Sequence, residues 1–163
     1  MKDKVYFAAF KGKSFISKLI KFWTRSEYSH IAYLEDINDT YLIEAWKFED
    51  GTYWGFSSFQ NHTKGTPVEI WEKEVTSKEK EIVRNVMVKF ATNKVPYDWK
   101  GIFGFVLKCK DDKNKYFCSE GCAYALKEAG IWNKDLNISV IHPGYFVQLM
   151  LVSNFKKVKS FYV

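Results

Sequence analysis

The chain has 163 residues, 47% of them hydrophobic, which is enough for a full core, so we expect a single domain over residues 1–163. Its formal charge of +6 favours anionic partners, but no nucleic-acid module accompanies it, so nucleic acid is not expected. No stretch approaches the ~20 apolar residues of a membrane span, the first apolar run is too short for an export signal, and the three cysteines form no disulfide framework, which together predict a cytoplasmic protein.

The first third of the chain predicts a strand, an amphipathic helix and a β-hairpin. Residues 5–10 are rich in β-forming types, and residues 13–23 place apolar side chains at helical spacing. Residues 28–34 and 40–46 are two strand-like runs. The Asp and Asn residues between them favour a turn, so the two runs are expected to pair.

The register of this hairpin brings an imidazole and a carboxylate together. If the turn is centred near Ile37, His30 lies directly opposite Glu44 on the same face of the sheet. A carboxylate beside a histidine can orient the ring and stabilise its protonated form. The alternative is an ordinary polar pair at the margin of the sheet, and a one-residue change of register would separate the two side chains.

The middle and end of the chain predict mostly scaffold. Residues 47–64 are polar and aromatic with several glycines, and we expect a long surface excursion that frames a cleft. Thr76 and Glu79 form a capping box that opens a helix packed in the core. Three further elements are expected, namely a strand over 66–72, a short helix over 145–150 and a terminal strand over 155–163.

The segment 116–130 is the one on which the chemistry depends. Cys118 lies in the first turn of a predicted helix, and small residues follow on the same stripe until Gly130 ends the helix. A thiol at a helix N-terminus feels the positive end of the helix dipole, which favours the reactive thiolate. Cys118 is therefore a candidate nucleophile, and the alternative is a small thiol buried in a core helix.

These residues combine into one constellation, with Cys118 as nucleophile, His30 as base and Glu44 as the group that orients the base. An oxyanion could receive hydrogen bonds from the backbone N–H of Cys118 or Ser119. Tyrosine hydroxyls are further candidates, with Tyr28 and Tyr97 preferred over Tyr116. Most tyrosines merely pack, which is the alternative for both.

Other interpretations use the remaining histidines and cysteines. His62 and His142 are alternative bases, although His142 precedes Pro-Gly and is typical of a turn. Cys109, Cys118, Cys122 and His142 contain the donors of a Cys3His zinc site, but they lack the paired knuckles that such sites use. We therefore expect neither a metal nor another cofactor.

Several short motifs also resemble a known family. The stretches YSHIAYL at 28–34, LIEA at 42–45, VPYD at 95–98 and FCSEGCAYALKEAG at 117–130, followed by a turn at Pro143, occur in that order. In this the chain resembles the circularly permuted branch of the NlpC/P60 superfamily of papain-like cysteine hydrolases, which includes the YiiX-like and lecithin:retinol-acyltransferase-like proteins. The resemblance covers roughly residues 5–150.

The resemblance implies an α+β fold, with an antiparallel sheet packed against the helix that bears the cysteine. It also implies His30 as base, Glu44 as orienter and Cys118 as nucleophile. Gly121 and Cys122 depart from the family pattern, which has bulkier aliphatic residues after the cysteine.

The expected function is a cysteine-dependent hydrolase that cleaves an amide, peptide-like bond through a covalent acyl-enzyme. Acyl transfer, or hydrolysis of a lipid ester or thioester, is the alternative within this class. A non-catalytic module that binds anionic surfaces is the alternative outside it, and a host-directed effector or phage-borne factor is a third. The expected partners are a small-molecule, peptide or acyl substrate, with possible weak contact to an anionic membrane or cell-wall surface.

Overall fold

A computed structural model describes residues 2–98 and 115–163. Its strands form one antiparallel sheet in the order β4-β3-β2-β1-β5-β6. The strands are β1 (Lys2–Phe10), β2 (His30–Leu34), β3 (Tyr41–Phe48), β4 (Gly51–Ser58), β5 (Pro67–Thr76) and β6 (Lys156–Tyr162). The α-helices of the described residues are α1 (Phe15–Thr24), α2 (Ser77–Thr92), α4 (Cys118–Glu128) and α5 (Pro143–Val152), with 3₁₀ turns η1 (Phe59–Asn61) and η2 (Ile138–Val140). The predicted α+β class is confirmed.

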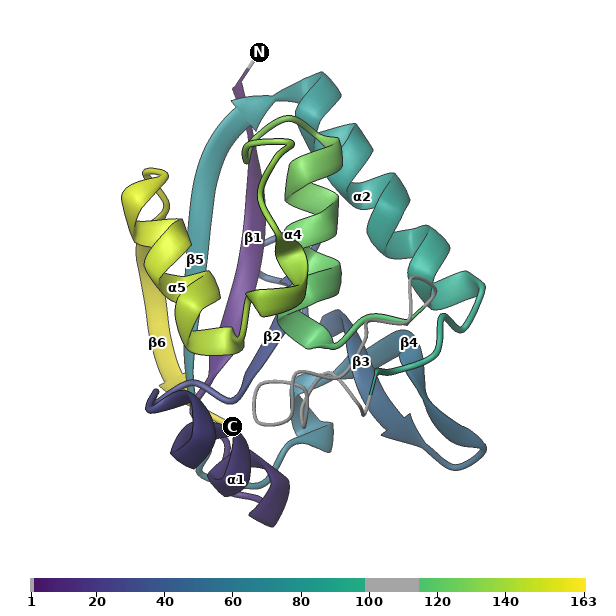
Figure 1. Cartoon of the computed structure of the whole chain (residues 1–163), viewed down its shortest axis with the longest axis vertical. Coiled ribbons are helices and arrows are strands. Elements are labelled where there is room, and N and C mark those ends of the chain that lie inside the picture. Colours follow the sequence, from purple (N-terminus) through teal and green to yellow (C-terminus); the bar gives the residue numbers. More distant parts are fainter. Residues whose placement is uncertain (1, 99–114) are drawn as a thin grey trace.

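One face of the sheet carries the main core. Helices α2, α4 and α5 lie together on that side of the central strands (Figure 1). Phe7 of β1 is fully buried there, with its ring centroid 5.4 Å from that of Phe146 on α5. The opposite face holds a smaller apolar cluster, where Phe59 of η1 packs edge-on against Phe161 of β6. Because both faces are covered, the central strands are apolar on both sides.

Helix α4 packs unusually close to its neighbours. It contacts β2 and α2, and Cys122, Ala125 and Leu126 have no exposed surface. A Cβ atom at Gly121 would lie 2.3 Å from the ring of Trp54, so only glycine fits at this approach. The departure at Gly121 from the family pattern is thus explained by the buried Trp54 ring on β4.

The capping predictions are confirmed in detail. Thr76 is the N-cap of α2, its hydroxyl accepts a hydrogen bond from the Glu79 N–H, and the Glu79 carboxylate accepts one from the Thr76 N–H. Gly130 follows α4 with a φ of +73°, the left-handed geometry expected of a glycine stop. His142 caps α5 by accepting from the Tyr145 N–H, so it is the turn residue the sequence indicated.

The prediction of a surface excursion over residues 47–64 is wrong. Residues 51–58 of this stretch form β4, which pairs with β3 along its whole length, from Tyr41 opposite Ser58 to Phe48 opposite Gly51. Gly51 makes the turn into β4 and Gly55 gives space to the Phe48 ring, so both glycines belong to a hairpin rather than to a loop. Because of this error, the predicted sheet lacked β4, and Ser57 and His62 were not placed beside Glu44.

Candidate active site

The structure brings His30, Glu44 and Cys118 together from three different elements. His30 is the first residue of β2, Glu44 lies in the middle of β3, and Cys118 opens α4 after the N-cap Phe117. The His30 imidazole hydrogen-bonds through Nε2 with the Glu44 carboxylate, and it lies close enough to Cys118 for the two side chains to interact electrostatically. One imidazole therefore links a thiol at a helix N-terminus to a buried acid.

The predicted register that motivated this pair is wrong by two residues. Tyr33 pairs with Ile43, and that register places Trp46 across from His30, with ring centroids 6.1 Å apart. The connecting loop continues to Thr40, one residue further than predicted. A shift of two keeps every side chain on its own face, so Glu44 still reaches His30, along the diagonal instead of directly.

The charges of this group stabilise one another. Burial lowers the pKa of His30, but the negative charges of Cys118 and Glu44 outweigh it and raise that pKa to about 10. Burial raises the pKa of Glu44, but His30 and His62 outweigh it and lower that pKa to about 2. The geometry thus favours a protonated imidazole beside an ionised Glu44, as a thiolate–imidazolium pair requires.

Glu44 is held by more than His30. Its side chain is fully buried, and the second carboxylate oxygen accepts from the Ser57 hydroxyl and lies 3.2 Å from Nε2 of His62. The Phe10 ring stacks on the His62 ring at 4.1 Å between centroids, and Trp46 lies 4.4 Å from the same ring. His62 is therefore part of the support of Glu44, and not the base that contacts Cys118.

Sequence reasoning missed Ser57 altogether and assigned His62 only as an alternative base. Both lie in or directly after the stretch that was taken for a surface excursion. Ser57 pairs with Leu42, two residues from Glu44, so the alternation along β4 would have placed it on the same face. Nothing local in the sequence indicates that His62 turns back to Glu44, because that contact depends on the η1 turn.

The oxyanion candidates differ in where the structure places them. Ser119 is fully buried, and its hydroxyl donates to the Ile141 carbonyl at 2.6 Å, so only its backbone N–H suits an oxyanion. The side chain of Phe117 offers no acceptor to the first turn of α4, where N–H groups lack intrahelical partners. Burial and the Cys118 charge raise the pKa of Tyr97 well above its ordinary value, so its hydroxyl stays protonated near the nucleophile.

Tyr28 is directed elsewhere. Its hydroxyl donates to the Glu69 carboxylate at 2.8 Å, and Lys11 and Lys157 lie on the other oxygen of Glu69. Burial, together with that hydrogen bond, raises the pKa of the Tyr28 hydroxyl. The contacts of Tyr28 thus tie β5 to the loop before β2, whereas those of Tyr97 belong to the site.

The cysteine-based zinc site does not form among the described residues. Cys109 lies outside them, Cys122 is buried in the core, and His142 caps α5. The metal-compatible group in the described part of the chain is His30, Glu44 and His62, whose donor atoms all lie within 4.8 Å of one another. Two imidazoles and a carboxylate suit a divalent metal, but the direct His30–Glu44 hydrogen bond is closer than two ligands of one zinc ion lie, which is roughly 3.3 Å for bonds of about 2.0 Å.

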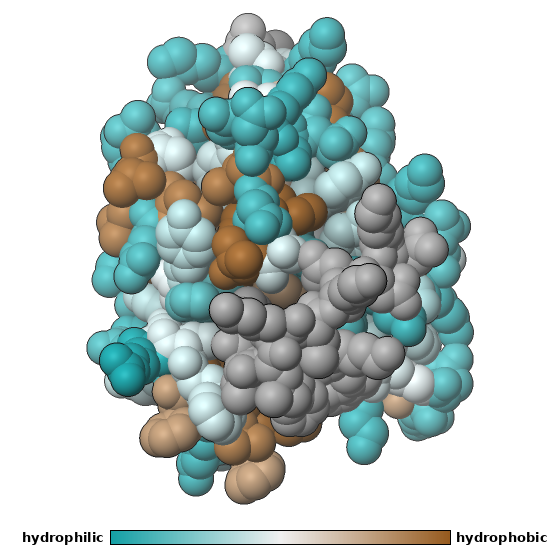
Figure 2. All heavy atoms as spheres, viewed as in Figure 1, coloured by the Kyte–Doolittle hydropathy of each residue, from teal (hydrophilic) through white to brown (hydrophobic). Residues whose placement is uncertain are grey.

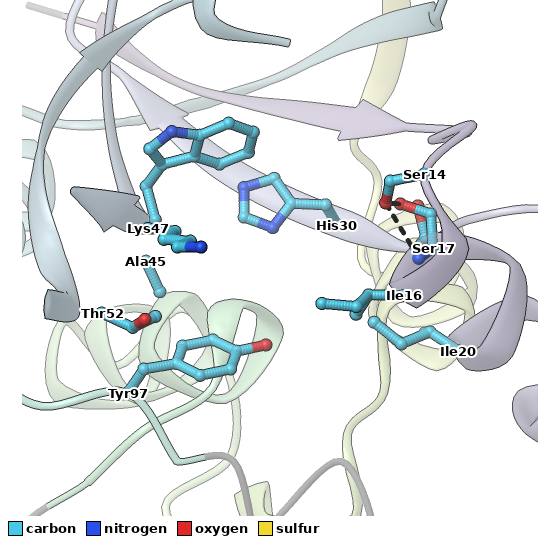
Figure 3. Close-up of a pocket in the computed structure, with 11 residues that line it drawn as sticks. Ser14, Ile16, Ser17, Ile20, His30, Ala45, Lys47, Thr52 and Tyr97 are labelled. Atoms are coloured by element: carbon cyan, nitrogen blue, oxygen red, sulfur yellow. Dashed lines mark hydrogen bonds between the residues drawn. The ribbon is translucent and has the colours of Figure 1, made fainter. Parts of the chain in front are cut away.

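A pocket of about 180 Å³ opens beside His30. Figure 3 shows His30 and Tyr97 on opposite sides of it, with Ile16 and Ile20 of α1 forming a third wall. The polar part of the lining also includes Lys47, Thr52 and three serines, Ser14, Ser17 and Ser29. Because both His30 and Tyr97 interact with Cys118, the pocket leads from α1 toward the candidate nucleophile.

The fold defines a class before any particular protein is considered: an antiparallel α+β domain in which a helix carries a cysteine to the end of a sheet that carries a histidine. The crystal structure of the metalloprotein YiiX from Escherichia coli O157:H7 is similar, with a TM-score of 0.56 and 16% sequence identity. The match covers 91% of this chain and 81% of the YiiX chain, which shows the shared fold alone. No protein-family model matches the sequence, and no curated protein matches it significantly.

Proposed function

We propose that this protein is a cysteine-dependent hydrolase of the permuted NlpC/P60 type, with Cys118, His30 and Glu44 as its triad. The observation that carries the proposal is a single imidazole that hydrogen-bonds with the fully buried Glu44 and interacts electrostatically with the thiol at the start of α4. Nucleophile, base and orienter then occupy the positions their roles require.

The proposed reaction has two halves. The Cys118 thiolate attacks the carbonyl carbon of an amide bond, and the His30 imidazolium protonates the leaving nitrogen as the C–N bond breaks. Water then attacks the thioester, neutral His30 takes its proton, and the acid leaves while the thiol is regenerated as a thiolate–imidazolium pair. An ester or thioester substrate would follow the same steps, and an acceptor other than water would make the enzyme an acyltransferase.

The surroundings supply the remaining roles. Glu44 holds the His30 ring through Nε2 and stabilises the imidazolium. The first-turn N–H groups of Cys118 and Ser119 are the proposed oxyanion donors, and the Tyr97 hydroxyl is a further one. Glu44 and His30 lie in paired strands, Cys118 and Ser119 lie in α4, and Tyr97 forms an isolated bridge with Tyr116 just before that helix.

The experiment that tests this proposal needs no substrate. The folded protein is treated with iodoacetamide across a range of pH, and the modification of each cysteine is followed by mass spectrometry. Trypsin leaves Cys118 and Cys122 on one peptide, residues 116–127, so fragment ions must distinguish them. Cys118 should be alkylated already at mildly acidic pH, and it should react faster than Cys122, because burial raises the pKa of the Cys122 thiol.

The variants His30→Ala and His142→Ala form a matched pair for this measurement. The first removes the imidazole beside Cys118, and the second removes one that caps α5. The low-pH reactivity of Cys118 should disappear in His30→Ala and persist in His142→Ala. A Cys118 that reacts like an ordinary thiol in the unaltered protein would overturn the proposal.

Metal binding is a second candidate function, favoured by the His30, Glu44 and His62 donor set and by the description of YiiX as a metalloprotein. A metal held there would take His30 away from Cys118. Calorimetric titration with zinc distinguishes the two candidates. A metal site predicts zinc binding that His62→Ala abolishes. The triad predicts no zinc binding that depends on His62. The direct His30–Glu44 hydrogen bond favours the triad.

A further inference from the structure

Helix α1 presents large apolar side chains to solvent. Phe15 is 75% exposed, Phe22 73%, Trp23 49% and Ile16 44%, while Ile20 is the buried residue of the helix. Among the described elements, α1 packs extensively against no other helix or strand. Figure 1 places it at one end of the molecule, and Figure 2 shows apolar side chains at the same end. A continuous patch of this kind marks an interaction surface.

Helix α1 is stabilised by the capping of its two ends and not by packing against other elements. Ser14 caps it by accepting from the Ser17 N–H, and Arg25 closes it in the left-handed conformation with a φ of +48°. Helices of this length are marginal in water unless their apolar face is covered. Burial of the exposed apolar face of α1 against a partner would therefore stabilise the helix.

The arrangement of side chains around α1 is that of an interfacial helix. At 100° per residue, Phe15, Phe22 and Trp23 share one stripe, and Lys18 and Lys21 lie along its flank. In the part of the chain that the structure describes, neither lysine makes an ion pair with a carboxylate. A stripe of aromatic residues beside unpaired cations suits the boundary between acyl chains and anionic headgroups.

We propose that α1 docks this protein on an anionic lipid surface, with Phe15, Phe22 and Trp23 at the acyl boundary and Lys18 and Lys21 on the headgroup phosphates. A duplex nucleic acid would use the same cations, but its bases are already stacked on one another and offer little surface to exposed phenylalanines. A second copy of this chain would bring the same cations together, and their repulsion disfavours that contact. Charge and apolar exposure occur side by side here, and a lipid surface is the partner that satisfies both.

Docking in this way would bring the pocket to the lipid surface. Ile16 is both part of the exposed face and part of the pocket wall, and Ile20 continues that wall toward His30 and Tyr97. An apolar path thus runs from the outer face of α1 to the candidate active site. This step rests on the proposed function, whereas the docking itself does not.

The test is flotation of the full chain with two kinds of vesicle, one of equal parts phosphatidylglycerol and phosphatidylcholine and one of phosphatidylcholine alone, at roughly 0.1 M salt. The protein should bind the first at least about tenfold more strongly than the second. The pair Phe15→Ser and Phe22→Ser, made together, should reduce binding to the anionic vesicles about tenfold or more. Lys18→Glu with Lys21→Glu should do the same.

Each variant has a matched control elsewhere on the surface. Leu151 and Val152 of α5 are 56% and 79% exposed, so Leu151→Ser with Val152→Ser removes exposed apolar side chains from a different helix. Lys78→Glu with Lys134→Glu changes the net charge as much as the α1 reversal does, at two exposed positions. Both controls should bind as the unaltered protein does.

Spectroscopy locates the contact. Brominated lipid should quench part of the tryptophan fluorescence of the bound protein, and Trp23→Phe should remove most of that quenching without abolishing binding. Failure to bind anionic vesicles, or an equal loss in the α1 variants and their controls, would overturn the proposal.

Other occupants of the face give different results. If vesicle binding is absent, two results would identify another occupant and overturn the proposal. The first is a dimer that dissociates in the Phe15→Ser, Phe22→Ser variant. The second is binding to duplex DNA that only the lysine reversal weakens. None of these measurements uses catalysis, so their failure is distinguishable from failure of the cysteine alkylation test.

Discussion

The two helices that border the His30 region, α4 and α1, use their apolar residues in opposite ways. Helix α4 is built largely from small residues and is almost completely buried, with Cys118, Cys122 and Ala125 at 1% exposure or less. Helix α1 carries phenylalanine, tryptophan and isoleucine, and most of these side chains face solvent. The more hydrophobic of the two helices is therefore the exposed one.

The difference has a packing cause. Small residues let α4 approach β2 and the Trp54 ring closely, and close approach excludes water from the whole first turn. No described element lies against the outer face of α1 in the same way. The place of each helix relative to the sheet thus decided its burial, and the small residues of α4 fit the close approach while the large residues of α1 lie outside it.

The largest expected effect lies on the buried side. Glu44→Ala would leave His30, His62 and Ser57 without their shared acceptor, and we expect it to lower the free energy of unfolding by about 3–5 kcal/mol. Urea unfolding measures this. The control is Glu74→Ala, which removes an exposed partner of Lys2 and should change the free energy of unfolding far less than Glu44→Ala does. Equal losses in the two variants would show that the Glu44 network is not a structural centre.

The second effect is a dependence of stability on pH. The pKa of His30 is about 10 in the folded protein against an ordinary 6.5, so folding binds a proton there. Its stabilisation is complete below pH 6.5 and is lost as the pH rises toward 10. The pKa of Glu44 is lowered from 4.5 to about 2, so its contribution is present above pH 4.5 and is lost as the pH falls toward 2.

Urea unfolding between pH 6.5 and pH 10 measures the alkaline part. We expect a loss of about 2 kcal/mol or more, since one pKa unit corresponds to about 1.4 kcal/mol. His30→Gln should flatten the curve over that range, which separates His30 from the tyrosines and lysines that also titrate there. Parallel curves for the two proteins would contradict the assigned charge state of His30.

The smallest effects compare the two helices directly. Gly121→Ala places a methyl group against the Trp54 ring, and overpacking of this kind typically costs about 1–3 kcal/mol. Phe22→Ser removes a far larger side chain from α1, yet it should change stability by less than about 0.5 kcal/mol because that side chain is 73% exposed. Thermal unfolding of both variants checks the contrast. A larger loss in Phe22→Ser would mean that α1 is packed more firmly than its exposure indicates.

Features encoded within a few residues were predictable from the sequence. The capping box at Thr76 and Glu79, the cysteine at the start of α4 and the stop at Gly130 depend only on local hydrogen bonds and backbone conformation. The contact of His30 with Glu44 survived an error of two residues in register. Strand alternation has a period of two, so the face of each side chain was determined even where its exact neighbour was not.

Tertiary structure alone decided the rest. The second support of Glu44 comes from Ser57 and His62, which reach it only because β4 pairs with β3 and the chain then turns back through η1. The exposure of α1 likewise follows from where the sheet ends. Local patterns indicate which face of an element is apolar. The neighbour that covers this face is decided by contacts between residues far apart in the chain, and no short-range pattern contains those contacts.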